Sequence, residues 1–434
     1  MNPSTLFNTS LFGVRKDLSA NLVKSFMLSG SNPVLDPNTA PLIYVGIRND
    51  GQIGSGTLTD PYDGSTQSHF ESLFNNLPAS CHVIILPGTY NISRVFMQSA
   101  VTGGTKWIQG SGIGITIIKK IDINTNVVDI YQAPLQHYDD TASIKVSDLT
   151  IDSNNRGQTY TNTLSLPALS LACLHGEVEN VECLDCYGGG GGESFFVCVF
   201  NSSPVDATCS IRNVTLKTAG GIATGICAFN QYNASLGGGT MTGIIDSCKV
   251  IDAPGVMAFG PPSSRQRADN FTGAGLVINC MVINAQVVSG DTGNNLNCAY
   301  KNCYFDISDT AWGILIGGGG NTYENFLIED CTFITGDGAP PLVFSDHTSS
   351  AAFLGVHIHN CKFLRRKGSV NTTRPLVGWA NGASDASIIM TDNWADESFT
   401  CVPIASAIKL DRNYYLQTGN PIPNICPSYR LIDG

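Results

Sequence analysis

The chain has 434 residues, of which 14% are charged, and its 24 Lys and Arg against 35 Asp and Glu give a formal net charge of −11. This balance excludes the concentrated basic face that binding to nucleic-acid phosphates requires. The sequence contains no run of about 18 apolar residues, so we expect no membrane span.

Residues 1–40 form a leader that does not share the pattern of the rest. Asp17 is placed to cap a short helix that ends near Gly30. The apolar residues of this helix share one face: Leu18, Leu22, Val23 and Phe26. Such a face needs a partner, either the rest of the chain or another subunit. The leader lacks the apolar core and cleavage site of a signal peptide, so we expect the protein to fold in a cytoplasm.

Residues 41–141 are predicted to start a β-structure and to cover its end. Residues 42–45 have the composition of a strand, and a turn-rich loop follows at residues 60–64. We expect a helix from about Ser65. Its apolar face consists of Phe70, Leu73, Phe74 and Leu77. We interpret this helix as a cap, because an open solenoid end exposes a cross-section of its core.

Residues 142–416 repeat the pattern apolar, x, Asn or Asp, Cys, x, apolar. The Asn or Asp positions form a ladder: Asp148, Asn180, Asn213, Ser247, Asn279, Asn302, Asp330, Asn360, Asp392 and Arg412. Spacings of roughly 20 to 34 residues are typical of solenoids. Alternation with period two on both sides, and a parity break at the ladder, predict two short strands joined by a tight bend. We expect the ladder side chains to point inward and hydrogen-bond along the stack, which would prevent glycosylation of the Asn213 sequon.

Cysteines follow the ladder in consecutive repeats: Cys248, Cys280, Cys303, Cys331 and Cys361. Stacked side chains with parallel directions suit a disulfide dihedral poorly, so we predict a reduced column in the core. No paired C-x-x-C and His spacing indicates a zinc site. Residues 417–434, which are rich in Pro, are predicted to form a C-terminal lid.

With this repeat, residues 41 to 416 resemble the right-handed parallel β-helix proteins of the pectate-lyase superfamily. That group includes polysaccharide lyases, polygalacturonase-like hydrolases and phage tailspikes. The resemblance implies an all-β fold: a right-handed single-stranded parallel β-helix of about ten coils, with an N-terminal capping helix and a short N-terminal leader. We therefore divide the chain into a leader (1–40), a cap with the first coils (41–141), the coils with the Asn/Cys ladder (142–416) and the lid (417–434).

Candidate catalytic residues come from positions seven residues after the ladder, where Asp309 and Asp337 occur on successive repeats. If the register holds, the two stack about 5 Å apart, a separation that resembles a retaining glycosidase pair. A cation site, with Ca²⁺ as the candidate, and ordinary exposed turn carboxylates are the alternatives. The motifs of polygalacturonase-like hydrolases are missing, and we match no Arg to this pair as pectate lyases would require.

Three aromatic residues follow the same repeats and are candidates for carbohydrate binding, because sugar rings stack on aromatic faces: Trp312, Phe344 and Trp379. Arg265 and Arg267 are candidates to bind a uronate carboxylate, with a solvated loop as the alternative. The basic cluster of residues 365–367 is interpreted as a solvated turn.

These features predict a virion-associated protein, similar to a tailspike or tail fibre, that binds a surface polysaccharide. We expect a homotrimer that reaches other virion or assembly subunits through residues 1–40, with a virion or extracellular location after folding in the cytoplasm. A polysaccharide lyase or glycoside hydrolase of the same superfamily is the first alternative. A structural filament or decoration subunit without catalysis is the second.

Overall fold

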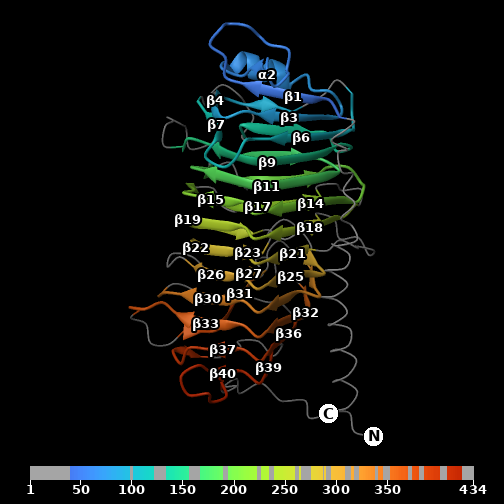
Figure 1. Ribbon diagram of the computed structural model, residues 1–434. Coiled ribbons are helices and arrows are strands. Elements are labelled where there is room, and N and C mark those ends of the chain that lie inside the picture. The colour runs from blue at the N-terminus through green and yellow to red at the C-terminus, as the bar shows by residue number, and fades with distance from the viewer. Residues whose placement is uncertain are drawn as a thin grey trace.

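The computed structural model describes residues 40–422, apart from 98–100, 122–132, 156–166, 189–193, 222–225, 234–238, 260–262, 265–274, 287, 290–294, 308–313, 317–321, 338–340, 346–351, 370–373, 381–385 and 401–407. The leader up to residue 39 and the end of the lid from residue 423 lie outside this part. What is described is an all-β, right-handed parallel β-solenoid with one short helix (Figure 1).

The first strand of each coil builds one long parallel stack, in which every strand pairs with the strand of the next coil. In stacking order its members are β1 (Leu42–Gly46), β3 (Cys81–Ile85), β6 (Thr105–Gln109), β9 (Ser143–Asp152), β11 (His175–Leu184), β14 (Ala207–Arg212), β18 (Met241–Asp246), β21 (Gly275–Ile278), β25 (Cys298–Lys301), β29 (Leu327–Glu329), β32 (Ala352–His359), β36 (Ala386–Thr391) and β39 (Ile408–Asp411).

A second parallel stack follows the bend of each coil. It contains β4 (Gly88–Ile92), β7 (Thr116–Lys120), the second halves of β9 and β11, β15 (Thr215–Lys217), β19 (Lys249–Phe259), β22 (Met281–Gln286), β26 (Tyr304–Ile307), β30 (Thr332–Thr335), β33 (Lys362–Arg365), β37 (Trp394–Ala395) and β40 (Tyr414–Tyr415).

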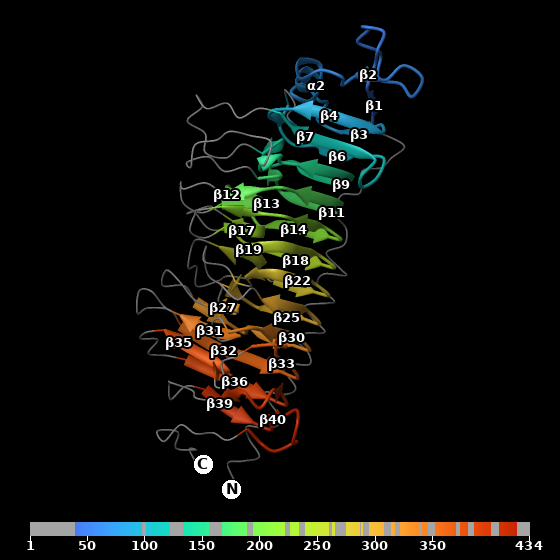
Figure 2. The same cartoon turned by 90° about the vertical axis from the view of Figure 1, so that its left-hand side faces the viewer.

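The remaining strands close the coils. One set pairs in order β5 (Val95–Phe96), β8 (Leu135–Tyr138), β10 (Leu169–Ala172), β13 (Ser194–Asn201), β17 (Ile226–Asn233) and β20 (Ser263–Ser264). Further along, β24 (Asn295–Leu296) pairs with β28 (Thr322–Glu324), and at the first coil β2 (Tyr62–Asp63) pairs with β1. A separate four-stranded sheet joins β23 (Val288–Ser289), β27 (Ile314–Ile316), β31 (Leu342–Ser345) and β35 (Val377–Ala380) (Figure 2). Two small parallel pairs are β12 (Tyr187–Gly188) with β16 (Gly220–Gly221) and β34 (Arg374–Pro375) with β38 (Phe399–Thr400).

The predicted ladder is correct in position and wrong in direction. Every ladder residue has a positive φ, from 50° at Asn213 to 59° at Asp148, which is the left-handed conformation that Asn and Asp adopt most readily after Gly. The side chains of Asn213, Asn279 and Asn302 are exposed, so they point outward. At the left-handed bend, the side chain of the ladder residue points to solvent, and the side chain of the following residue points into the core. The Asn213 side chain is therefore not withdrawn from solvent, contrary to the expectation that folding would prevent its glycosylation.

Outward ladder side chains hydrogen-bond along the stack. Asn213 Nδ2 donates to Asn180 Oδ1 over 2.6 Å, Asn302 to Asn279 over 2.7 Å and Asn360 to Asp330 over 2.7 Å. The expected contact between neighbouring coils therefore exists, but on the surface.

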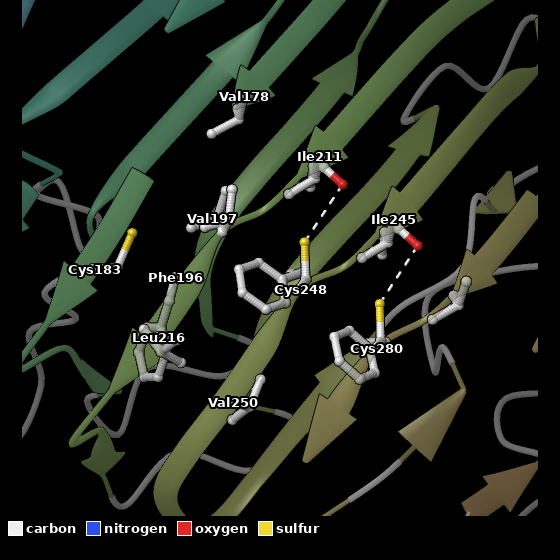
Figure 3. Packing of buried hydrophobic residues seen from close by; sticks show 14 of the residues in the cluster. Val178, Cys183, Phe196, Val197, Ile211, Leu216, Ile245, Cys248, Val250 and Cys280 are labelled. Atoms are coloured by element: carbon white, nitrogen blue, oxygen red, sulfur yellow. Dashed lines mark hydrogen bonds between the residues drawn. The ribbon is translucent and has the colours of Figure 1, made fainter. Parts of the chain in front are cut away.

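The cysteine column is confirmed as a buried stack of free thiols. Cys248 Sγ donates to the Ile211 carbonyl over 3.4 Å, and Cys280 Sγ donates to the Ile245 carbonyl over 3.5 Å (Figure 3). Each thiol thus bonds to a backbone group of the preceding coil. In the last two coils Asn393 and Asn413 occupy the same column position and are also buried.

The predicted helix is α2 (Gln67–Phe74), which begins two residues later than the sequence indicates. Thr66 is its N-cap and accepts a hydrogen bond from the His69 amide over 3.3 Å. Phe70 and Phe74 are fully buried, and their rings stack 4.4 Å apart. The helix lies at the end of the stack beside β1 (Figure 1). Within the described ranges no helix is long and apolar enough to cross a bilayer.

Candidate functional site

Two arginines and two carboxylates meet where the chain turns after β26, β30 and β33. We call Asp306, Asp337, Arg365 and Arg366 the Asp/Arg turn. The strands are in register, with Asp306 beside Ile334 and Ile334 beside Leu364, so the ends of three coils lie at the same edge. The predicted candidate Asp337 is part of this group.

Arg365 is the last residue of β33, and only 7% of its side chain is exposed. Its guanidinium carbon lies 5.8 Å from the centre of the Phe399 ring, and Nη1 donates to the Gly336 carbonyl over 2.8 Å. Nη2 donates to Asp337 Oδ1 over 3.0 Å. A planar guanidinium held by an aromatic ring and a carbonyl has one orientation in which to bind its carboxylate.

Two expectations need correction here. Asp337 does have an Arg on the neighbouring coil, although we matched none from the sequence. The solvated-turn interpretation of residues 365–367 is right only for Lys367, which is exposed. The side chain of Arg365 is buried instead, because the Phe399 ring and the carboxylate of the preceding coil replace water around it.

Arg366 reaches further along the stack. Its Nη2 donates to Asp306 Oδ1 over 2.5 Å and to the Ile307 carbonyl over 2.6 Å. Its backbone amide donates to the Thr335 carbonyl over 2.8 Å. About a third of the Arg366 side chain and 34% of that of Asp337 remain exposed, so both can meet a ligand from solvent.

Asp309, the predicted partner of Asp337, lies outside the described ranges, so the carboxylate pair stays a prediction. Among the residues that are described, no group of three or more His, Cys, Asp and Glu side chains could hold a metal ion. Ca²⁺ binding with Asp309 likewise stays a prediction.

The predicted aromatic residues are placed in part. Phe344 on β31 and Trp379 on β35 are direct partners in the four-stranded sheet, and Ile316 on β27 pairs with Phe344. The two aromatic positions therefore occupy one row of this sheet. Trp312, Arg265 and Arg267 fall in segments that the structure does not describe. Asp337 precedes β31 by five residues, so the Asp/Arg turn leads into the sheet that carries the row.

One surface cluster was missed by sequence reasoning. The Trp107 and His82 rings stack 4.1 Å apart at an interplanar angle of 1°, and Lys145 Nζ lies 5.1 Å from the centre of the Trp107 ring. The same Nζ binds Glu177 over 2.7 Å and Glu179 over 2.6 Å. The register of β3, β6, β9 and β11 brings these residues together. Sequence reasoning could have found the cluster only by aligning these strands, and the first coils lack the regular repeat that such an alignment needs.

Comparison with known proteins yields likenesses of fold alone. No family model matches the chain, and no curated protein matches it. Among solved structures, the A-module of the Azotobacter vinelandii mannuronan C-5 epimerase AlgE6 is 13% identical over 77% of this chain and 91% of its own, with a TM-score of 0.44. The catalytic domain of a GH87 alpha-1,3-glucanase is 12% identical over 87% of this chain and 70% of its own, with a TM-score of 0.48.

A third similar structure is the tailspike protein gp49 from Acinetobacter baumannii bacteriophage Fri1, described as a capsular polysaccharide depolymerase. It is 11% identical over 83% of this chain and 61% of its own, with a TM-score of 0.46. The predicted parallel β-helix fold is confirmed by the parallel stack of coils in this chain.

Proposed function

We propose that this β-helix protein binds a surface polysaccharide at the Asp/Arg turn and belongs to a virion, in the manner of a tailspike or tail fibre. The observation that carries the proposal is the pair of Arg365 and Asp337, joined over 3.0 Å between neighbouring coils. It holds a partly exposed carboxylate in one position. Carboxylates and guanidinium groups at fixed positions are suitable hydrogen-bond partners for sugar hydroxyls and uronates.

The same pair makes Asp337 a hydrogen-bond acceptor. A glycosidase needs one protonated carboxyl group as its acid, with a second carboxylate on the other side of the scissile bond. Asp337 is instead an acceptor in an ion pair whose arginine is fixed by Phe399 and Gly336. An acceptor fixed in this way can orient a hydroxyl group, but it is poorly placed to donate a proton.

The test is retention of the full chain on an array of bacterial capsular and uronate-containing polysaccharides. Asp337→Asn is expected to weaken binding at least about tenfold, because a charge-assisted hydrogen bond contributes about 1.5–3 kcal/mol. Glu182→Gln is the matched control, since Glu182 also forms an ion pair, over 2.5 Å to Lys217, on a distant coil. Retention on no glycan, or equal loss in both variants, would contradict the proposal.

The first alternative is a polysaccharide lyase or glycoside hydrolase, and the spacing of Asp309 and Asp337 in the sequence favours it. It predicts new reducing ends or unsaturated uronates from a retained glycan, lost in Asp309→Asn and Asp337→Asn. Dependence on Ca²⁺ would identify the lyase form. The second alternative, a structural filament or decoration subunit, predicts self-assembly or particle binding with no glycan retained.

We also propose how the chain is divided. Residues 142–416 form about ten coils, α2 caps a unit of residues 41–141, and residues 417–434 form a lid. The leader of residues 1–40 attaches the protein to other subunits or trimerises it, on a virion or outside the cell after cytoplasmic folding. The native mass of the purified chain, with and without residues 1–40, tests this: a trimer that becomes a monomer supports it, and a monomer in both forms contradicts it.

A further inference from the structure

Two aromatic rings meet on the outer face of the strands that close the early coils. Tyr138, the last residue of β8, pairs in register with Ala172 on β10, and Ala172 pairs with Phe200 on β13. The neighbouring residues Leu171 and Val199 are fully buried in the core, so alternation turns this row outward. The centres of the Tyr138 and Phe200 rings lie 6.3 Å apart, although two register steps of about 4.8 Å separate the two strands. The two rings therefore lean toward each other across the small Ala172.

A third ring extends this pair toward the N-terminal end. The Phe96 ring on β5 lies 5.9 Å from that of Tyr138, and the guanidinium carbon of Arg94 lies 4.9 Å from the centre of the Phe96 ring. We call Phe96, Tyr138 and Phe200 the aromatic row. Tyr138 is 42% exposed, and the other two are half-buried, whereas Tyr300 is fully buried in the core. The aromatic row thus presents ring surface to solvent.

A carboxylate follows the aromatic row and is held from two coils. Asp140 comes two residues after Tyr138 and is half-buried. Its Oδ1 accepts a hydrogen bond from the Ser202 amide over 3.0 Å, and its Oδ2 accepts one from the Ser203 hydroxyl over 3.0 Å. The fully buried Asn201 donates to the Asp140 carbonyl over 2.9 Å. An ionised carboxylate has about four acceptor positions, so Asp140 is fixed in place and can still accept from a ligand.

Rings beside a fixed carboxylate are suited to a sugar. The apolar face of a pyranose ring packs on an aromatic ring, and a carboxylate accepts hydrogen bonds from sugar hydroxyls. A uronate fits this place less well, because Asp139 and Asp140 put two carboxylates at the end of the row and like charges repel. We infer that the aromatic row and Asp140 form a second carbohydrate site, which binds a neutral sugar.

This second site is separate from the Asp/Arg turn. Four register steps, from β11 through β14, β18 and β21 to β25, lie between the coil that β13 closes and the coil of Asp306. At about 4.8 Å a step they amount to about 19 Å along the solenoid. The inference therefore stands on its own residues, whether or not the Asp/Arg turn binds a polysaccharide.

An array of neutral glucans, galactans and mannans, probed with the full chain, tests the site. The protein is expected to be retained on at least one of them. Tyr138→Ala should weaken this retention at least about fivefold, because it removes the most exposed ring, and Tyr138→Phe should preserve it. Asp140→Asn should also weaken it at least about fivefold, because the charged acceptor is lost. Retention on no neutral glycan, or retention that Tyr138→Ala leaves unchanged, would overturn the inference.

A matched control is Tyr414→Ala. Tyr414 is half-buried, and its ring lies 5.3 Å from that of Trp394 on the last two coils, without a place in the aromatic row. This variant should keep the retention of the full chain, and an equal loss in Tyr414→Ala and Tyr138→Ala would overturn the inference. Far-UV circular dichroism checks that each variant folds.

Asp337→Asn separates this site from the Asp/Arg turn. Neutral-glycan retention that falls in Tyr138→Ala but not in Asp337→Asn supports the second site even if the Asp/Arg turn binds nothing. The reverse pattern would overturn the second site and leave the proposal for the Asp/Arg turn standing. A changed native mass of Tyr138→Ala, with glycan retention unchanged, would also overturn the inference and make the aromatic row a contact between chains.

Discussion

The Asn393→Ala variant probes how the last coils replace cysteine by asparagine. Asn393 is fully buried, and its Oδ1 accepts from the Cys361 amide over 2.8 Å. Its Nδ2 donates to the Ile358 carbonyl over 3.1 Å and to Asn413 Oδ1 over 2.8 Å. The Ala side chain leaves the Cys361 N–H without its partner and removes the Nδ2 donor from the Ile358 carbonyl.

A buried backbone group without its partner costs about 1–3 kcal/mol. With one group orphaned and a second weakened, the free energy of unfolding should fall by about 2–4 kcal/mol. Urea denaturation followed by circular dichroism measures this, and hydrogen exchange should show the Cys361 amide losing protection, since coils of a solenoid depend on their neighbours.

The control for this variant is Asn360→Gly. Asn360 is exposed, and its positive φ suits Gly, so a change within about 0.5 kcal/mol is expected. A loss below about 1 kcal/mol in Asn393→Ala, or equal losses in the two variants, would refute the reasoning about buried hydrogen bonds.

Three other predictions concern buried residues of the interior. Burial lowers the pKa of His137 to about 4, below the ordinary value of 6.5, so the folded state binds fewer protons than the unfolded chain between these values. The free energy of unfolding should therefore fall by about 3 kcal/mol as the pH drops from 6.5 to 4. Urea titrations at both pH values measure this for the original protein and for His137→Phe. If the difference in stability between the two proteins is the same at both pH values, His137 is not the cause and the prediction is contradicted. Lys106 is fully buried, and its Nζ has no hydrogen-bond partner among the described atoms, so Lys106→Met should raise the melting temperature; a lower one would argue for a missed partner. Burial raises the pKa of the Cys280 thiol well above its ordinary range, so mass spectrometry should find it unmodified by iodoacetamide at pH 8 until the protein unfolds; rapid native labelling would contradict the packed column.

The ladder shows how far sequence reasoning reaches in this fold. Its positions were predictable because each bend needs a left-handed residue, and Asn and Asp adopt that conformation with little strain. Its direction was not, because alternation gives the relative parity of Asn302 and Cys303 but not which of them faces the core. Burial of the apolar residues two positions before the ladder, such as Tyr300, fixes the parity in the structure.

The Asp/Arg turn escaped prediction for a different reason. Arg365 and Asp337 are 28 residues apart, and Arg366 and Asp306 are 60 apart, so their contacts depend on the lengths of the intervening loops. Counting a fixed offset from the ladder found Asp337 but not its partner. Spacing predicted that Asp337 lies near the turn, whereas its contact with Arg365 is visible only in the folded chain.

The most direct test of polysaccharide binding is a crystal structure of the full chain with the shortest oligosaccharide that the array identifies. The account predicts a sugar hydroxyl or carboxylate within hydrogen-bonding distance of Asp337 or Arg366. A sugar bound elsewhere, for example beside Trp107, with the Asp/Arg turn unoccupied, would contradict it.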